Sequence, residues 1–272
     1  MIDSQPAAPL PRGWRWRGVG SLMLLVATSL EEVGVPHAFT TRLGGMSAAP
    51  FNTLNLGRGV GDDPVAVQTN RARAAAAVGR RLDDHVEASQ VHGASTAIVG
   101  AADRGGKIDG ADGLASSDPK TLLAVHCADC VPILLADPVR RAVAAVHTGW
   151  RGTAAGAAAS GVRAMHEAFG SRPADLRAAI GPAIGPCCYL VDAPVLERFA
   201  ASPWRDDVFA AAAPGQWRLD LWEANRRQLE DAGVPAGAVV TARLCTLDHP
   251  GLFFSHRRDG RSGRMAALIA LP

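Results

Sequence analysis

The residue types best suited to chemistry lie at the two ends of a pair of short apolar strands. Residues 131–136 follow Cys130, and residues 142–146 lead into His147. The segment Asp137-Pro138-Val139-Arg140 between them is typical of a turn. If the hairpin is symmetric about the middle of this turn, Cys130 and His147 face each other with Cβ atoms roughly 4.5–5.5 Å apart. That distance suits either a thiolate–imidazole pair or two ligands of one metal ion.

A second histidine offers a third partner for this pair. His92 ends a predicted strand in the segment Gln90-Val91-His92-Gly93. A lone histidine in that position is usually a surface or satisfied polar side chain. Together with Cys130 and His147, however, it completes a mixed nitrogen–sulfur set that suits zinc or copper. Three protein ligands leave a fourth position open, which is the pattern of catalytic metal sites.

Two basic segments are candidates for binding anions. Arg151 lies in the glycine-flanked segment 148–152 just before a predicted helix, where backbone N–H groups and a planar guanidinium suit phosphate or carboxylate. Near the C-terminus, His256, Arg257 and Arg258 follow two phenylalanines. This second segment is either a charged turn between two strands or an anion clamp.

The cysteines favour a reducing compartment, and we predict a cytoplasmic protein. Five cysteines are an odd number in a chain this long, which does not indicate a disulfide framework. Cys127 and Cys130 form a CxxC that leads into a strand rather than a helix, so it is not typical of a thioredoxin-like site, and Cys127 is interpreted as a small buried hydrophobe. A structural zinc site needs a second pair, which the adjacent Cys187 and Cys188 cannot easily supply.

Composition and element pattern predict one globular α+β domain. The 272 residues carry a net charge of +2, with 48% hydrophobic and 20% charged residues, which favours neither a nucleic-acid binder nor a membrane-surface binder. The apolar segment 21–30 is interpreted as a buried strand rather than a signal peptide because Glu31 and Glu32 follow at once. No apolar run reaches the roughly 20 residues of a membrane helix. We expect a loose arm over residues 1–18 and a single domain over 19–272.

Helices and strands alternate without a strict βαβ order, which favours mixed β-sheets with flanking helices. Helices are predicted after Asp63 to about residue 78, after Gly152 to about residue 169, and over 194–200 and 221–232. Strands are predicted over 86–91, 96–99, 121–125, 178–180, 239–244 and 265–271.

Taken in order, the motifs make the chain resemble the YfiH-like family, whose members are known as multicopper polyphenol oxidases, purine nucleoside phosphorylases or peptidoglycan editing factors. The matches run from about residue 35 to the end and include HAFTTRLGGMS, QVHG, DGADGL, HCADCVPILLAD, AVHTGWRGTAAG, AIGPAIGPCCYLV and FFSHRRDGRSGRMAALI. Any one of them is weak, whereas the ordered set is highly specific. The resemblance implies a mixed α+β sandwich with its site at one end of the sheets.

The resemblance also implies a metal site and an activity. His92, Cys130 and His147 would bind Zn²⁺, with Cu²⁺ as the alternative. The chain would be a purine nucleoside phosphorylase that takes adenosine, inosine or methylthioadenosine with phosphate and also deaminates adenosine. Two positions depart from the family pattern: His256 replaces a common tyrosine, and Cys127 replaces a smaller or hydroxyl-bearing residue. Both departures bear on the choice between zinc and copper.

Four further residues are candidates for the reaction. Charge and motif position make Arg42, Arg151 and Arg258 candidates for holding phosphate or substrate oxygens. Asp129 is a candidate general acid or base, or a residue that orients a metal ligand. The expected partners are a small-molecule nucleoside and phosphate, with neither nucleic acid nor a membrane, and the sequence leaves the oligomeric state open.

Three other functions stay open from the sequence. A Cys–His hydrolase that edits cell-wall precursors would use Cys130 as nucleophile and His147 as base. A copper-dependent polyphenol oxidase, or laccase, matches less well because a single mononuclear ligand set and eight histidines in all do not suit several coppers. A non-enzymatic regulatory binding module is disfavoured by the intact Cys/His set.

Overall fold

The computed structural model describes residues 9–272, so residues 1–8 of the predicted arm lie outside the described residues. The remainder of that arm differs from the expectation. Trp14–Val19 (β1) pairs antiparallel with Leu22–Ala27 (β2), and Trp14 is buried. An alternating Trp-Arg-Trp-Arg segment is typical of a strand with one face on the core. The ordered fold therefore begins before residue 19.

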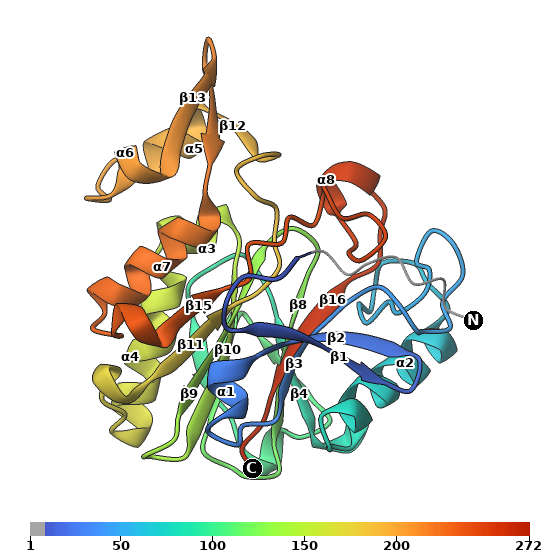
Figure 1. Cartoon of the computed structure of the whole chain (residues 1–272). Helices are drawn as coiled ribbons and strands as arrows, with labels where there is room; N and C mark the ends of the chain where they lie inside the picture. Colours follow the sequence, from blue (N-terminus) through green and yellow to red (C-terminus); the bar gives the residue numbers. More distant parts are fainter. Residues whose placement is uncertain (1–8) are drawn as a thin grey trace.

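Within residues 9–272, two large sheets pack face to face and a third, small sheet projects from one end of the molecule (Figure 1). The seven-stranded sheet has the order β1-β2-β3-β16-β8-β4-β6, with β3 at His37–Thr40, β16 at Met265–Ile269, β8 at Leu122–Cys127, β4 at His85–Ser89 and β6 at Lys107–Asp109. The six-stranded sheet has the order β15-β11-β9-β10-β7-β5, with bounds Val239–Thr241, Arg177–Ile180, Val131–Asp137, Ala142–Thr148, Gly113–Ser116 and Thr96–Ile98.

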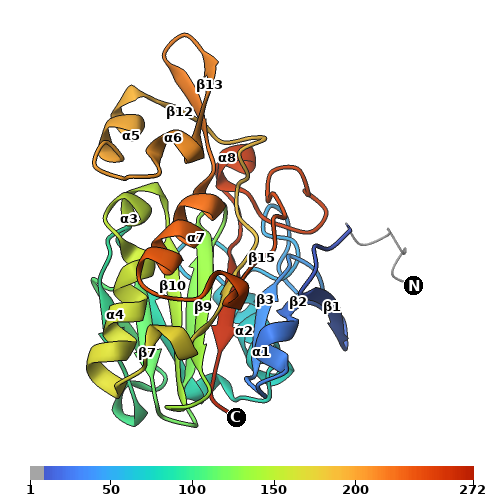
Figure 2. The ribbon, with the colours of Figure 1, turned by 60° about the vertical axis from the view of Figure 1, so that its left-hand side comes forward.

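Helices cover the outer faces of the two sheets, as the view in Figure 2 shows for the six-stranded sheet. Pro64–Ala77 (α2) packs on the seven-stranded sheet; Ala157–Phe169 (α4) and Leu221–Asp231 (α7) pack on the six-stranded sheet. Strand β9 is buried on both faces, which explains its continuous apolar sequence. Its Ile133 and Leu135 face the helices, whereas Leu134 and Ala136 face the other sheet. The predicted α+β class with mixed sheets and flanking helices is confirmed.

Local sequence explains where most helices begin and end. The side chain of Asp63 caps α2 by accepting hydrogen bonds from the N–H groups of Val65 and Ala66. The single helix predicted from 152 to 169 is wrong, because Gly156 has a φ of 82° and separates Trp150–Ala154 (α3) from α4. The remaining short helices are Thr28–Glu31 (α1), Ala193–Arg198 (α5), Arg205–Val208 (α6) and His256–Asp259 (α8).

The small third sheet was not expected from the sequence. It consists of Leu190–Asp192 (β12), Gln216–Leu219 (β14) and Phe209–Ala213 (β13), and it forms the projection at the top of Figure 1. Much of β13 is an exposed alanine run that lacks the alternation of a half-buried strand.

The central hairpin forms, but its register differs from the prediction. His147 pairs with Pro132, so the direct pairing of Cys130 with His147 is wrong by two residues. The turn includes residue 141, and Asp137 Oδ1 stabilises it by accepting two hydrogen bonds from backbone N–H groups of the turn. Because side chains alternate with a period of two, an error of two residues keeps both side chains on the same face of the sheet. Cys130 thus becomes a diagonal neighbour of His147 rather than its direct partner.

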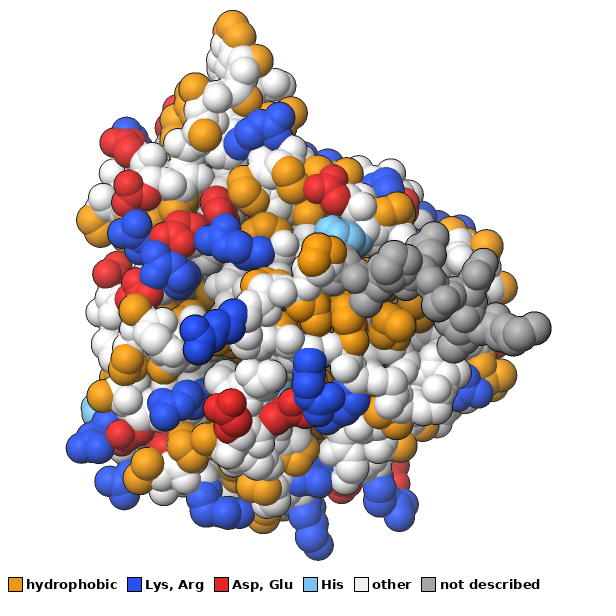
Figure 3. All heavy atoms as spheres, viewed as in Figure 1, with side chains coloured by type: hydrophobic (Ala, Val, Ile, Leu, Met, Phe, Trp, Pro, Cys, Tyr) orange, Lys and Arg blue, Asp and Glu red, His pale blue; other side chains and the backbone are white. Residues whose placement is uncertain are grey.

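The surface is mixed in charge. On the face shown in Figure 3, acidic and basic side chains lie next to one another. Part of this pattern comes from α7, where Glu223 forms ion pairs with Arg226 and Arg227. Among residues 9–272, no helix has the length and apolar character needed to cross a membrane.

Candidate metal centre

His92, Cys130 and His147 meet at one end of the sheets. One ligand atom from each lies within 4.8 Å of the others, although the three residues come from separate segments. His147 is the penultimate residue of β10, Cys130 immediately precedes β9, and His92 follows β4. His147 is buried, Cys130 is partly exposed and His92 is exposed, so the cluster opens to one side.

A buried carboxylate that the sequence analysis did not single out lies behind this cluster. Asp112 Oδ1 is 2.9 Å from Nδ1 of His147. The same carboxylate accepts hydrogen bonds from the N–H groups of Val91, His92 and Gly93 at 3.2, 2.9 and 2.7 Å. Because Nδ1 of His147 is engaged, Nε2 is the nitrogen left to face the cysteine. One side chain therefore orients one histidine and holds the backbone of the other; its only sequence signal is its place in the DGADGL motif.

Asp112 also explains an unusual backbone conformation. His92 has a φ of 61°, in the left-handed region that few non-glycine residues adopt. Three successive N–H groups around His92 converge on one carboxylate, and that hydrogen bonding offsets the cost of the conformation. The backbone at His92 is thus held in place by the same group that orients His147.

Cys130, His147 and Asp112 shift one another's pKa values. Burial raises the pKa of the Cys130 thiol, but the charge of His147 and hydrogen bonds from His147 and His92 outweigh it and bring the value to about 6. Burial lowers the pKa of His147, but the charge of Cys130 and the hydrogen bond to Asp112 raise it to about 9. Burial opposes the charge on Asp112, yet its hydrogen bonds hold its pKa below the ordinary value. At neutral pH without metal the pair is a thiolate beside an imidazolium, and a metal ion bound by both side chains would take the place of the imidazolium proton.

Two glycines allow the loops of the cluster to approach closely. A Cβ atom on Gly149 would lie 3.0 Å from Cys130 Sγ and equally close to Cδ2 of His92. A Cβ atom on Gly152 would lie 2.7 Å from the carbonyl oxygen of Gly93. The sequence predicts an anion-binding loop here, and the structure gives its glycines a packing role beside the ligands.

Asp129 lines a pocket next to Cys130 but is itself held by hydrogen bonds. Its Oδ1 accepts from Oγ1 of Thr246 and its Oδ2 accepts from the N–H of Arg257, each at 2.6 Å. Its φ is 93°. These contacts join the turn before Cys130 to two C-terminal segments, an arrangement that favours an orienting role for Asp129.

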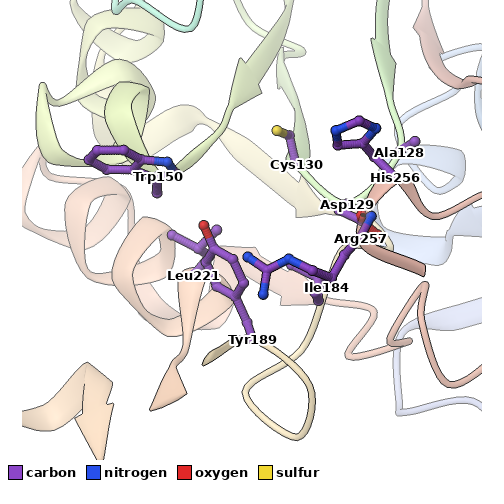
Figure 4. A pocket seen from close by; sticks show the side chains of 9 residues that line it. All are labelled: Ala128, Asp129, Cys130, Trp150, Ile184, Tyr189, Leu221, His256 and Arg257. Carbon is purple, nitrogen blue, oxygen red and sulfur yellow. Dashed lines mark hydrogen bonds between the residues drawn. The ribbon is translucent and has the colours of Figure 1, made fainter. Parts of the chain in front are cut away.

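The pocket beside Cys130 has aromatic, apolar and basic walls (Figure 4). Its volume is about 130 Å³, and it is lined by Ala128, Asp129, Cys130, Trp150, Ile184, Tyr189, Leu221, His256 and Arg257. The Arg257 guanidinium lies 5.0 Å from the centre of the Tyr189 ring. A neighbouring cavity of about 350 Å³ is lined by His92, Trp150, Arg151, Ala154, Ala155 and Arg198. Trp150 borders both spaces. The first space reaches Cys130 and the second reaches His92.

The structure places the three predicted substrate-binding arginines differently. Arg151 lies at the cavity beside His92, and its guanidinium carbon is 4.4 Å from the centre of the Trp150 ring. Arg258 instead pairs with Asp259 and donates to three backbone carbonyls, those of residues 246, 247 and 253.

Arg42 likewise stabilises loops. It donates to the carbonyls of Asn52 and Pro250 and lies over the Phe254 ring. Neither Arg42 nor Arg258 lines the two spaces described above. The residues of the C-terminal basic cluster that do are His256 and Arg257, neither of which the sequence singled out as substrate-binding.

Comparison with known proteins supports the resemblance seen in the sequence. Residues 36–272 match the family model for multi-copper polyphenol oxidoreductase laccase. The purine nucleoside phosphorylase YlmD of Geobacillus stearothermophilus is 43% identical over 251 residues, covering 87% of this chain and 90% of that protein. A purine nucleoside phosphorylase of Deinococcus radiodurans is 42% identical over 242 residues, covering 89% and 91%.

Solved structures agree. The hypothetical protein YfiH of Bacillus licheniformis has a TM-score of 0.90 at 40% identity, covering 96% of this chain and all of that one. YlmD of Geobacillus stearothermophilus has a TM-score of 0.89 at 39% identity, covering 96% and 99%. The fold is therefore shared over almost the full length.

Proposed function

Since this chain belongs to the YfiH-like family, matched by the model for multi-copper polyphenol oxidoreductase laccase, we propose that it is a zinc-dependent purine nucleoside phosphorylase. Adenosine, inosine and methylthioadenosine are the proposed nucleosides, and adenosine deamination is the proposed second activity. The name carried by the curated relatives supports the phosphorylase. The observation that carries the proposal is the His92–Cys130–His147 cluster, oriented by a buried carboxylate and opening into a pocket.

The residues present fit a zinc ion. A thiol and two imidazoles are donors that zinc prefers, and three of them leave room for a fourth ligand. His147 carries the outer carboxylate that zinc-binding histidines commonly have. Zinc held there would supply Lewis-acid polarisation of substrate oxygens and lower the pKa of a water molecule to about 7. Copper is the alternative ion for the same donors.

The chain's own side chains would bind and orient the two substrates. In phosphorolysis an oxygen of inorganic phosphate bonds to C1′ of the ribose while the bond from C1′ to the purine nitrogen breaks. Trp150 and Tyr189 offer aromatic faces to the purine. Arg257 and Arg151, one in each of the two spaces that Trp150 borders, offer guanidinium groups to phosphate. Asp129 would act as a positioning residue, since it holds the backbone N–H of Arg257.

The test is metal analysis combined with product analysis. The protein is purified without a metal-binding tag, its bound metal is measured, and adenosine is followed by chromatography with and without phosphate. Adenine that forms only with phosphate supports the phosphorylase, and inosine supports deamination. Cys130→Ser should lose the metal of this cluster and the activity, whereas the matched variant Cys127→Ala should keep both. Absence of both products with metal bound would overturn the proposal.

The two neighbouring arginines provide a sharper test of the pocket. Arg257→Ala should raise the KM for phosphate about 10-fold or more, because a charge-assisted hydrogen bond contributes about 1.5–3 kcal/mol. Arg258→Ala should instead lower the free energy of unfolding, because it leaves backbone carbonyls without their donor. The reverse pattern would place phosphate at Arg258, as the sequence analysis expected.

One observation favours a second candidate, the Cys–His hydrolase. Cys130, His147 and Asp112 stand in the order of nucleophile, base and orienting carboxylate. Such an enzyme would cleave an amide of a cell-wall precursor without metal. Amide cleavage that survives complete chelation, and that stops on alkylation of Cys130, would favour this candidate over the phosphorylase.

A further inference from the structure

A second group of metal-ligating side chains lies outside the centre described above. Cys187, Cys188, Cys245 and Asp248 each offer one ligand atom, and these four atoms all lie within 4.8 Å of one another. The sulfurs of the adjacent cysteines are 2.9 Å from the two oxygens of Asp248, Cys187 from Oδ2 and Cys188 from Oδ1. From the sequence, the adjacent Cys187 and Cys188 are not expected to supply the second pair of a zinc site with Cys127 and Cys130. The backbone turn at residues 186–188 nevertheless directs both toward the same carboxylate.

We propose that these four residues form a second, structural metal site that takes Zn²⁺. Four protein ligands in a closed set are typical of structural zinc sites, and three of the four are sulfur. The single carboxylate disfavours Cu(I), which prefers soft ligands. The site uses no residue of the His92–Cys130–His147 centre and does not depend on the proposed phosphorylase activity.

Without metal, burial and the carboxylate of Asp248 raise the pKa of the Cys187 and Cys188 thiols, whereas the surroundings of Cys245 suit a thiolate. The N–H of Gly185 points at Cys245 Sγ at 3.3 Å, a hydrogen bond that favours the charged form of the sulfur. A Cβ atom on Gly185 would lie 3.1 Å from Cys187 Sγ, so this glycine leaves room for the sulfur. Arg218 donates to the carbonyl oxygen of Cys187 and so brings a positive charge beside the cluster. Without metal, the thiols of Cys187 and Cys188 donate hydrogen bonds to Asp248. Metal binding would release these thiol protons to solvent.

Metal at this site would cross-link two loops that lie beside the pocket next to Cys130. Cys187 and Cys188 belong to the loop that carries Ile184 and Tyr189, both of which line the pocket. Cys245 lies next to Thr246, which holds Asp129. Without metal these loops are joined by the isolated bridge between Ala183 and Cys245 and by the hydrogen bonds of Gly185, Cys187 and Cys188 described above. Bound zinc would add a cross-link between segments about 60 residues apart.

The experiment counts metal in the full-length protein. After reduction, zinc is added, excess is removed and zinc is measured per chain. The wild type should bind two equivalents, Cys130→Ser one, and the double variant Cys187→Ser, Cys188→Ser one. Cobalt then replaces zinc, and the thiolate-to-cobalt absorption of Cys130→Ser, whose second cluster is unaltered, should correspond to three thiolates.

Two further variants keep the test falsifiable if the double variant fails to fold. Asp248→Asn keeps the size of the side chain and should weaken zinc binding at this cluster by at least about 10-fold. Cys127→Ala removes a cysteine outside both clusters and should leave two equivalents. A wild type that binds one equivalent, lost in Cys130→Ser, would overturn the proposal. So would a cobalt spectrum of Cys130→Ser without thiolate absorption.

Discussion

The two sulfur-containing clusters differ in what holds their ligands in place. The first cluster stands at the ends of strands β4, β9 and β10, which are buried and hydrogen-bonded to neighbours along their length. The second stands on two loops, and Cys187 and Asp248 are exposed. Strand ends and Asp112 hold the first set in place without metal, whereas loops alone carry the second. Metal at the first cluster would therefore serve chemistry, and the second would gain structure from it.

The position of the carboxylate differs as well. Asp112 stands behind the first cluster and contacts Nδ1 of His147, the ring nitrogen that faces away from Cys130. Asp248 stands within the second cluster and touches two sulfurs directly. Three ligands beside a cavity are typical of catalytic zinc, and four ligands in a closed set are typical of structural zinc. The same residue type thus orients a ligand in one region and is a ligand in the other.

The largest effect on activity should come from removing a ligand of the first cluster. Cys130→Ser should lower kcat/KM for phosphorolysis by about 1,000-fold, since metal-ion catalysis supplies several kcal/mol and each 1.36 kcal/mol is a factor of ten. Cys188→Ser should leave the metal of the first cluster in place. Steady-state kinetics and metal analysis on both variants check this. Loss of the first metal in Cys188→Ser would show that the two regions are not independent.

Substituting each carboxylate should separate orientation from ligation. Asp112→Asn should weaken zinc binding at the first cluster about 10- to 100-fold, because an orienting partner of a ligating histidine is lost. It should also destabilise the fold, since an amide nitrogen would face N–H groups that now donate hydrogen bonds to the Asp112 carboxylate. Chelator competition measures the affinity, and Asp248→Asn is the matched control, which should leave this first affinity unchanged.

The sequence predicted the first cluster because periodicity constrains it. Cys130 and His147 flank strands whose side chains alternate, so even a register error of two residues left them on one face. Asp112 escaped notice because three of its four partners are backbone N–H groups, which no residue pattern reveals. Arg257 and Arg258 are adjacent, and only the course of the chain decides which of them enters the pocket.

The second cluster and the third sheet escaped prediction for a related reason. Both depend on loops, and a loop has no period that places its side chains. Cys245 meets Cys187 and Cys188 because Ala183 and Cys245 form a bridge between distant segments. The longer helices α2 and α7, in contrast, were predicted to within one or two residues.

Metal removal should affect the second cluster first. Two of its four ligands, Cys187 and Asp248, are exposed to a chelator, against one of three, His92, in the first cluster. Zinc at 100 times its dissociation constant contributes about 2.7 kcal/mol, which corresponds to a Tm increase of about 5 °C for a domain of this size. Thermal melts after graded chelation should therefore show a fall in Tm before activity is lost. Simultaneous loss of both would contradict the proposed division between structural and catalytic metal.

The smallest effect should come from a methyl group beside the first cluster. In Gly149→Ala the new Cβ would lie 3.0 Å from Cys130 Sγ and from His92 Cδ2, so both ligands must move by a few tenths of an ångström. Displacing a side chain from its preferred angle costs about 0.5–1.5 kcal/mol, which lowers zinc affinity about 3- to 10-fold. Gly237→Ala, where nothing lies within 4 Å of the added Cβ, is the control and should change nothing. Equal affinities in the two variants would mean that the loop at Gly149 yields freely, and that strand ends do not hold the first cluster more tightly than loops hold the second.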